Sequence, residues 1–328
     1  MKTALKWTIS ILVSLVILVI AMFLATRSDY PVERLVTDDP SLPSQTVAGV
    51  QLHLRIVQGP AGAPTVIVLH GGPGGDFRSL QALDALTNRY HVVFYDQRGA
   101  GLSERVSADM LTLDGHLEEL QGVIDVTSPN QAPILIGHSW GAMLAAAFLG
   151  QNPDAVESAV LIEPGYLDAE GRQAWEEESR TYTSGPRYVW EAVTTGFRAQ
   201  HVSGPDVAAP NDFLIVHMVG VFTNHPDNPY HCGGGYTAPN WRFGALSSAT
   251  WRDAPSSEID RLGSRVAAFQ GPVLLIAGAC NDWLGPLQRR NLSRFTNAEL
   301  VSIPNAGHDV LWDNPEATRA AIRSFLDE

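Results

Sequence analysis

A serine in a tight turn between two apolar segments is the residue best suited to do chemistry. Ser139 lies in the stretch Gly137-His138-Ser139-Trp140-Gly141. The apolar run at 133–136 before it is typical of a buried strand, and the run at 142–149 after it is typical of a helix packed against a sheet. So tight a turn holds the serine at a strained backbone angle and lifts its hydroxyl clear of the sheet, and small neighbours leave room for it. We therefore interpret Ser139 as a nucleophile, which needs a neighbouring base.

A glycine-rich loop follows another expected strand. The run Thr65–Leu69 is continuously apolar, as in a strand buried on both faces, and His70-Gly71-Gly72-Pro73-Gly74-Gly75 comes directly after it. Glycines there let backbone N–H groups face a ligand without obstruction by a Cβ. We expect the N–H groups of Gly72 and Trp140 to form an oxyanion hole. A phosphate-binding loop is the rival interpretation, but neither G-K-[ST] nor G-x-G-x-x-G is present.

A third motif, Asp96-Gln97-Arg98-Gly99-Ala100-Gly101-Leu102-Ser103, follows the expected strand at 91–95. We expect Asp96 and Arg98 to pin a structural turn as a carboxylate–guanidinium pair rather than to do chemistry. The three motifs together resemble the α/β-hydrolase family, in particular its proline-iminopeptidase-like branch, over about residues 47–328. His138 departs from that branch, which more often carries glycine there. The resemblance implies a mostly parallel sheet flanked by helices, with an inserted cap.

The resemblance also implies a base and an acid that follow Ser139 in the chain. His308 lies on a glycine-bearing loop between the last expected strand and the closing helix, which is where the family places its base. The acid is ambiguous, because the position where the family usually carries it is Asn281. We favour Asp282, one residue later. The alternative is Glu163, at the end of the preceding strand, with Asp282 as a residue of the loop turn.

The expected organisation has five parts. Residues 1–27 form a membrane anchor or signal-anchor, and residues 28–45 form a polar tether. The hydrolase core occupies residues 46–165 and 258–328. Between them, residues 166–257 lose the α/β alternation and are rich in aromatic residues, which is typical of a cap inserted after the sixth strand. Such a lid would suit a ring-bearing or apolar substrate.

The N-terminal segment is apolar enough to cross a membrane. The only lysines, Lys2 and Lys6, precede the uncharged run at 7–25, which as a helix would span about 28 Å. This arrangement favours an N-terminus inside and the bulk of the chain outside, in the periplasm or the extracellular space. A cleaved signal peptide, which would give a secreted protein, is the alternative, but cleavage after Ala25 would put Phe23 at the −3 position, where a small residue is preferred.

Composition limits the possible partners. The formal charge of −13 argues against nucleic acid, because phosphate binding needs a basic face. Cys232 and Cys280 permit one disulfide outside the cytoplasm, and two buried free thiols are the alternative. No C-x-x-C or histidine-rich spacing suggests a metal, and we expect no cofactor.

The resemblance implies an aminopeptidase that releases an N-terminal residue, often proline, through an acyl-enzyme. Such enzymes hold the substrate amine with carboxylates of the cap, and the sequence offers five without singling one out: Glu170, Glu176, Glu177, Glu178 and Glu191. A carboxylesterase or lipase-like hydrolase of small acyl esters is the alternative, because the same triad cleaves esters more easily. A non-catalytic binding protein that keeps the fold is the alternative from another class.

Overall fold

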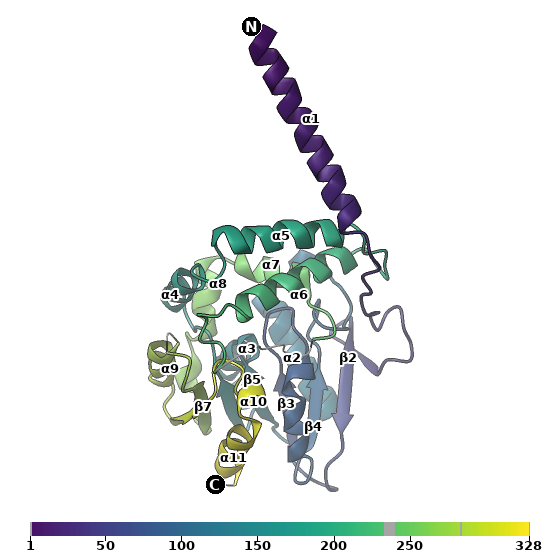
Figure 1. Ribbon diagram of the computed structural model, residues 1–328. Helices are drawn as coiled ribbons and strands as arrows, with labels where there is room; N and C mark the ends of the chain where they lie inside the picture. The colour runs from purple at the N-terminus through teal and green to yellow at the C-terminus, as the bar shows by residue number, and fades with distance from the viewer. Residues whose placement is uncertain (1, 233–239, 283, 328) are drawn as a thin grey trace.

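The computed structural model describes residues 2–232, 240–282 and 284–327, and its centre is one mixed sheet (Figure 1). The strands lie in the order β1-β2-β4-β3-β5-β6-β7-β8. The first two are antiparallel to their neighbours and the rest are parallel, as the resemblance implies. Their bounds are β1 Ser44–Val47, β2 Val50–Val57, β3 Thr65–Leu69, β4 His91–Tyr95, β5 Ile134–His138, β6 Ser158–Ile162, β7 Val273–Gly278 and β8 Ala298–Ile303.

The central strands are buried on both faces, which explains their continuous apolar sequences. In β3, Val66 and Val68 belong to one apolar cluster, whereas Ile67 and Leu69 belong to the other, as the alternation of side chains along a strand requires. Helices α2 (Leu113–Thr127) and α3 (Trp140–Gln151) cover the face of the second cluster and contribute many of its residues.

The first cluster lies on the opposite face of the sheet, where η1, α10 and α11 cover it. These are Phe77–Leu86, Val310–Asp313 and Pro315–Leu326. Element η1 is a 3-10 helix whose N-terminus is capped by the side chain of Asp76. Two further helices are α9 (Gly285–Leu292), which contacts β7 and β8, and α8 (Ser256–Ile259), which contacts α4.

Between β6 and β7 the chain forms a helical insertion at one end of the sheet (Figure 1). It contains α4 (Ala169–Ser179), α5 (Gly185–Ala199), α6 (Ala209–Thr223) and α7 (Ala245–Arg252). Helices α5 and α6 pack against each other. The turns that follow β3 and β5 face this insertion, because cavities between the two are lined by residues of both.

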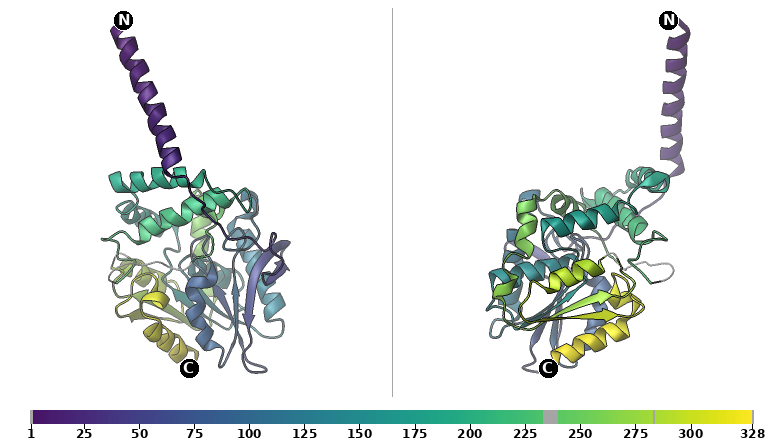
Figure 2. Two further views of the ribbon diagram at one scale, coloured as in Figure 1. Left: turned by 45° about the vertical axis from the view of Figure 1, so that its right-hand side comes forward. Right: turned by 90° about the vertical axis from the view of Figure 1, so that its left-hand side faces the viewer.

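Helix α1 (Lys2–Ala25) extends away from the rest of the molecule (Figure 2). Its segment Ala4–Ala25 is long and apolar enough to cross a membrane, and no part of that segment is buried. A signal sequence near the N-terminus can meet the same criteria, so the helix is a candidate anchor or signal sequence.

The segment expected to be a polar tether packs along the domain instead of hanging free. Leu35 and Val36 are only 3% and 2% exposed. The N–H of Val36 donates to the carbonyl of Leu102 at 2.9 Å, and the carbonyl of Glu33 accepts from Arg242 at 3.1 Å. The apolar residues within this short segment fix the distance between α1 and the domain.

Candidate active site

Ser139 occupies a strained turn between β5 and α3. Its backbone has φ 53° and ψ −118°, a conformation that residues with a side chain rarely adopt. A Cβ at Gly141 would overlap the carbonyl of Leu69, and a Cβ at Gly137 would overlap that of Gly141. Both glycines are therefore required for the turn to pack, as predicted. Ser139 itself is only partly buried and lines two cavities.

The two expected oxyanion donors, Gly72 and Trp140, both line a cavity together with Ser139. Gly72 has φ +131°, and a Cβ there would lie 2.5 Å from the nitrogen of Gly74, so this loop conformation needs glycine. Gly72 is exposed and lines both cavities with Ser139. Trp140 is the first residue of α3, so its N–H has no carbonyl one turn earlier to bond with, and the helix N-terminus favours negative charge.

His308 lies between β8 and α10, where two rings hold its imidazole. Tyr230 of the insertion stacks on it with the ring centroids 4.3 Å apart, and His138 lies on it at 4.8 Å. The main chain is held as well, because the N–H of His308 donates to the carbonyl of Tyr230 at 2.9 Å. His308 is 4% exposed and lines the same cavity as Ser139.

The structure places Glu163, and not Asp282, beside the imidazole. Glu163 Oε2 lies 3.4 Å from His308 Nδ1, and the carboxyl group is fully buried. Asp282 is exposed at the surface, and the neighbouring Asn281 instead donates to Glu163 Oε2 at 2.8 Å. Of the two expected candidates for the acid, the contact with His308 favours Glu163 over Asp282. The reason is local: Glu163 has φ 48°, and this bend after β6 turns its side chain toward the loop that follows β7.

Burial dominates the electrostatics of this pair. It lowers the pKa of His308 to about 4, so the imidazole is neutral at pH 7 and can accept a proton. Burial raises the pKa of Glu163 to about 8, while the N–H of Gly278, at 2.5 Å, and the amide of Asn281 favour the carboxylate and oppose that rise. The two groups titrate as a pair, because a proton taken up by the imidazole favours the carboxylate form of Glu163 beside it.

Two cavities meet at Ser139. The smaller has a volume of about 340 Å³ and also contains His308, Asp309 and residues of α6. The larger has a volume of about 590 Å³ and extends under α4, α5 and α7. Its charged lining residues are Arg172, Arg180, Arg252 and Glu176. A substrate with two arms could therefore place one on each side of the serine.

Comparison with known proteins identifies the family. Residues 64–315 match the model of the alpha/beta hydrolase fold. The chain belongs to this family. The expected fold and the assignment as an enzyme are thereby confirmed, since the similar proteins include peptidases, lipases and lactonases.

Two relatives and one solved structure illustrate the range of similar proteins. A proline iminopeptidase of Heyndrickxia coagulans is 35% identical over 168 residues, which is 51% of this chain and 57% of that relative's length. The sn-1-specific diacylglycerol lipase ABHD11 of Mus musculus is 25% identical, over 84% of this chain and 85% of its own. A proline iminopeptidase-related protein from Thermus thermophilus has a TM-score of 0.62 at 22% identity, over 88% of this chain and 97% of its own.

The Asp96–Ser103 motif of this hydrolase positions the site, but not through the expected ion pair. Asp96 accepts from His53 and from the N–H of Leu102, each at 2.8 Å. Arg98 pairs instead with Glu119 of α2, with Nε 3.0 Å from Oε2 and both side chains buried. The expectation of a structural turn is met, whereas the pairing of Asp96 with Arg98 is wrong.

Gln97 and Asn281 contribute to the site, although the sequence analysis did not select them. Gln97 accepts from the indole N–H of Trp140 at 2.8 Å, and its own amide donates to the carbonyl of His70 at 3.0 Å. It therefore ties the glycine-rich loop to the turn that carries Ser139. The position of Gln97 inside a turn motif was the available signal. For Asn281 the signal was that it occupies the position at which the family usually carries the catalytic acid.

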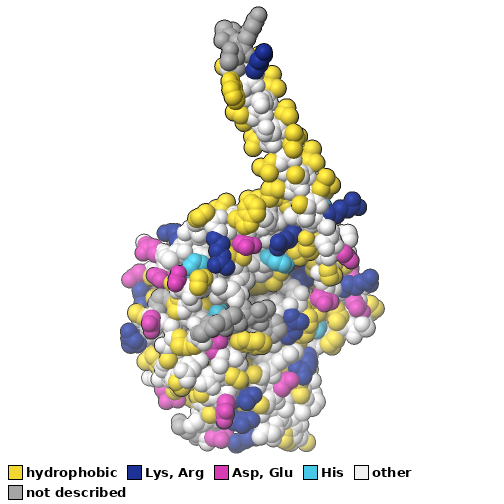
Figure 3. Space-filling view, viewed as in Figure 1, with side chains coloured by type: hydrophobic (Ala, Val, Ile, Leu, Met, Phe, Trp, Pro, Cys, Tyr) yellow, Lys and Arg dark blue, Asp and Glu magenta, His cyan; other side chains and the backbone are white. Residues whose placement is uncertain are grey.

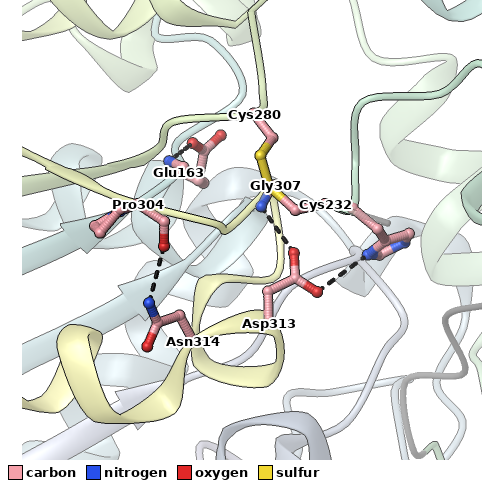
Figure 4. Close-up of a disulfide and its surroundings, with 9 residues drawn as sticks. Glu163, Cys232, Cys280, Pro304, Gly307, Asp313 and Asn314 are labelled. Atoms are coloured by element: carbon pink, nitrogen blue, oxygen red, sulfur yellow. Dashed lines mark hydrogen bonds and ion pairs between the residues drawn. A yellow bond between two sulfur atoms is a disulfide. The ribbon is translucent and has the colours of Figure 1, made fainter. Parts of the chain in front are cut away.

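A disulfide joins the insertion to the core beside the acid. Cys232 and Cys280 are bonded, with their Cα atoms 5.8 Å apart. Figure 4 shows this bond next to Gly307, with Glu163 on the same side as Cys280. Cys280 directly precedes Asn281, so the bond fixes the loop whose amide holds Glu163.

Proposed function

We propose that this protein is a serine hydrolase in which Ser139, His308 and Glu163 form the catalytic triad. The observation that supports the proposal best is the buried contact of Glu163 with His308 Nδ1, which leaves Nε2 of the imidazole for the cavity that contains Ser139. Glu163 would hold the imidazole in the tautomer with a proton on Nδ1 and stabilise it once it becomes cationic.

The reaction would proceed in two halves. Ser139 Oγ attacks the substrate carbonyl carbon while His308 takes the hydroxyl proton, and the N–H groups of Gly72 and Trp140 bind the oxyanion. The carbon–nitrogen or carbon–oxygen bond then breaks, and His308 gives its proton to the leaving group. Water attacks the acyl-enzyme with the same proton transfers and releases the acid.

We propose an aminopeptidase of the proline-iminopeptidase type as the specific activity, on the basis of the 35% identical relative and the motifs shared with that branch. Of the five insertion carboxylates considered, Glu176 lines a cavity, but it is paired with Arg172 at 2.7 Å. Asp309 lines the smaller cavity beside Ser139 and His308. Asp309 is therefore our candidate for the group that binds the substrate amine.

A carboxylesterase is the second candidate, and the larger cavity supports it. Three arginines and one glutamate line that cavity, and this surplus of positive charge repels an N-terminal amine. A neutral or anionic acyl ester avoids that repulsion. The lipase among the relatives agrees with such a substrate.

Parallel kinetics of the full chain on prolyl-p-nitroanilide and p-nitrophenyl acetate separate the two activities. An aminopeptidase should have the higher kcat/KM on the anilide, and Asp309→Asn should raise KM for the anilide without raising it for the ester. Glu176→Gln is the matched control and should leave the KM for both unchanged. Turnover of the ester alone, with no effect of Asp309→Asn on KM, would favour the esterase.

The remaining parts of the chain fit this activity as follows. We propose that residues 28–45 connect a membrane anchor at 1–27 to a hydrolase core at 46–165 and 258–328, and that residues 166–257 act as its cap. The lysines before the apolar helix and the disulfide between Cys232 and Cys280 support a catalytic domain outside the cytoplasm. Mass spectrometry of the mature protein would distinguish an anchor from a cleaved signal.

A further inference from the structure

Helix α5 carries an exposed apolar face that the hydrolytic site does not explain. Val189, Trp190 and Val193 are 58%, 60% and 43% exposed. Their spacing places them on one side of the helix, whereas Thr195 and Ala199 are buried on the other. Figure 3 shows apolar side chains gathered over this end of the molecule, next to the base of α1.

The end of α1 is fixed beside this face by several contacts. The ring of Phe23 packs on His201 with the centroids 4.4 Å apart, and His201 Nε2 lies 2.8 Å from the carbonyl of Phe23. The hydroxyl of Tyr30 donates to the carbonyl of Thr26 at 2.8 Å, and its ring packs on Phe213. Helices α1 and α5 also contact each other directly. The chain therefore leaves α1 at a defined place against the insertion.

The directions of the two helices then place α5 relative to a membrane. Helix α1 stands away from the domain. Helix α5 lies across the surface of the domain from which α1 emerges, as Figure 1 and both views of Figure 2 show. The apolar segment Ala4–Ala25 would span about 33 Å, which matches the hydrocarbon core of a bilayer. If α1 crosses the bilayer, the membrane surface passes along α5.

We propose that α5 lies in the interface of the bilayer that α1 crosses, with Val189, Trp190 and Val193 inserted at the boundary between headgroups and acyl chains. Tryptophan prefers this depth, because its ring is apolar and its N–H can reach water. Arg187 and Arg198 stand near the two ends of the helix, where guanidinium groups can reach lipid phosphates. Tyr188 of the same helix lines the larger cavity, so α5 would separate the bilayer from the space next to Ser139.

The proposal rests on α1 as a membrane span and goes beyond the hydrolytic activity. Its test uses the full chain in phosphatidylcholine vesicles that contain lipids brominated near the headgroup, which quench tryptophan fluorescence at that depth. Trp190→Phe should lose a large part of the quenched emission of the wild type. Trp312→Phe is the matched control, because Trp312 is 48% exposed on α10, away from α1, and this variant should keep that quenched emission.

Three results would overturn the proposal. Equal quenching of the wild type and Trp190→Phe would show that α5 does not touch lipid. Loss of quenching upon dimerisation would show that a second copy covers the face. A full chain that fails to float with the vesicles would show that the protein does not bind the membrane. Trp7 lies within α1, so its own quenching is common to all variants and cancels in the comparison.

Discussion

The assignment of the acid can be tested by exchanging each candidate carboxyl for its amide. In the transition state the imidazole of His308 carries a positive charge 3.4 Å from Glu163 Oε2. With an effective dielectric constant of 20, that pair interacts by about 5 kcal/mol. Because 1.36 kcal/mol is tenfold in rate, Glu163→Gln should lower kcat by between about 10³ and 10⁴.

Rotation of the glutamine side chain in Glu163→Gln cannot restore the lost activity, because of the donors that surround it. Gly278 N–H donates to Oε1 and Asn281 donates to Oε2, so one of these donors must face the NH₂ group of glutamine. That mismatch costs about 1–3 kcal/mol of folding stability, and thermal unfolding should show it. Glu163→Asp, which keeps the charge, should recover part of the activity.

Asp282→Asn is the matched control, because the residue is exposed on the loop that also carries Asn281. Its kcat should stay within about twofold of the wild type, since exposed charges interact weakly through water. The assay is steady-state turnover of whichever of the two chromogenic substrates is cleaved faster. A loss above about 10² in Asp282→Asn, together with nearly full activity in Glu163→Gln, would refute the reasoning.

Three other outcomes are expected. The acid limb of the kcat/KM profile should lie below pH 6.5 and report the imidazole, because burial lowers the pKa of His308 to about 4; a limb near pH 8 would instead report protonation of Glu163, whose pKa burial raises to about 8, and would contradict this. The double variant Cys232→Ser/Cys280→Ser should lose up to about 4 kcal/mol in denaturant unfolding, as the bond closes a separation of 48 residues, and reductant should bring the wild type to the same value. Arg98→Met should lower the free energy of unfolding by about 3–5 kcal/mol, because it leaves the buried carboxylate of Glu119 without its guanidinium partner. Arg180→Met, at a side chain 69% exposed, should change it by less than about 0.5 kcal/mol. Equal effects of the two variants would argue against the buried pair.

The sheet was predictable because its physics is local. A strand buried on both faces must be apolar throughout, and Thr65–Leu69 and His91–Tyr95 have the bounds expected from their sequences. The turn at Ser139 was equally clear, since glycines lie two residues before and after it. A Cβ at either glycine would overlap a backbone carbonyl. In these segments the residue types themselves indicate the conformation.

Partners far apart in the chain were not predictable. Glu163 and Asp282 both follow strands that end at the same edge of the sheet, and Glu163, where the backbone bends, is the one that faces His308. Arg98 has a carboxylate two residues away at Asp96, yet it pairs with Glu119, which α2 brings against the turn. Such choices depend on the packing of whole elements, which the spacing of residues does not encode.

Capture of the nucleophile by a fluorophosphonate tests the central claim most directly. The full chain, digested and examined by mass spectrometry, should carry the adduct on the peptide that contains Ser139. The adduct should be absent in Ser139→Ala and should form far more slowly in His308→Ala, because the hydroxyl then has no base. Labelling of another serine, or labelling of Ser139 at the same rate without His308, would contradict the account.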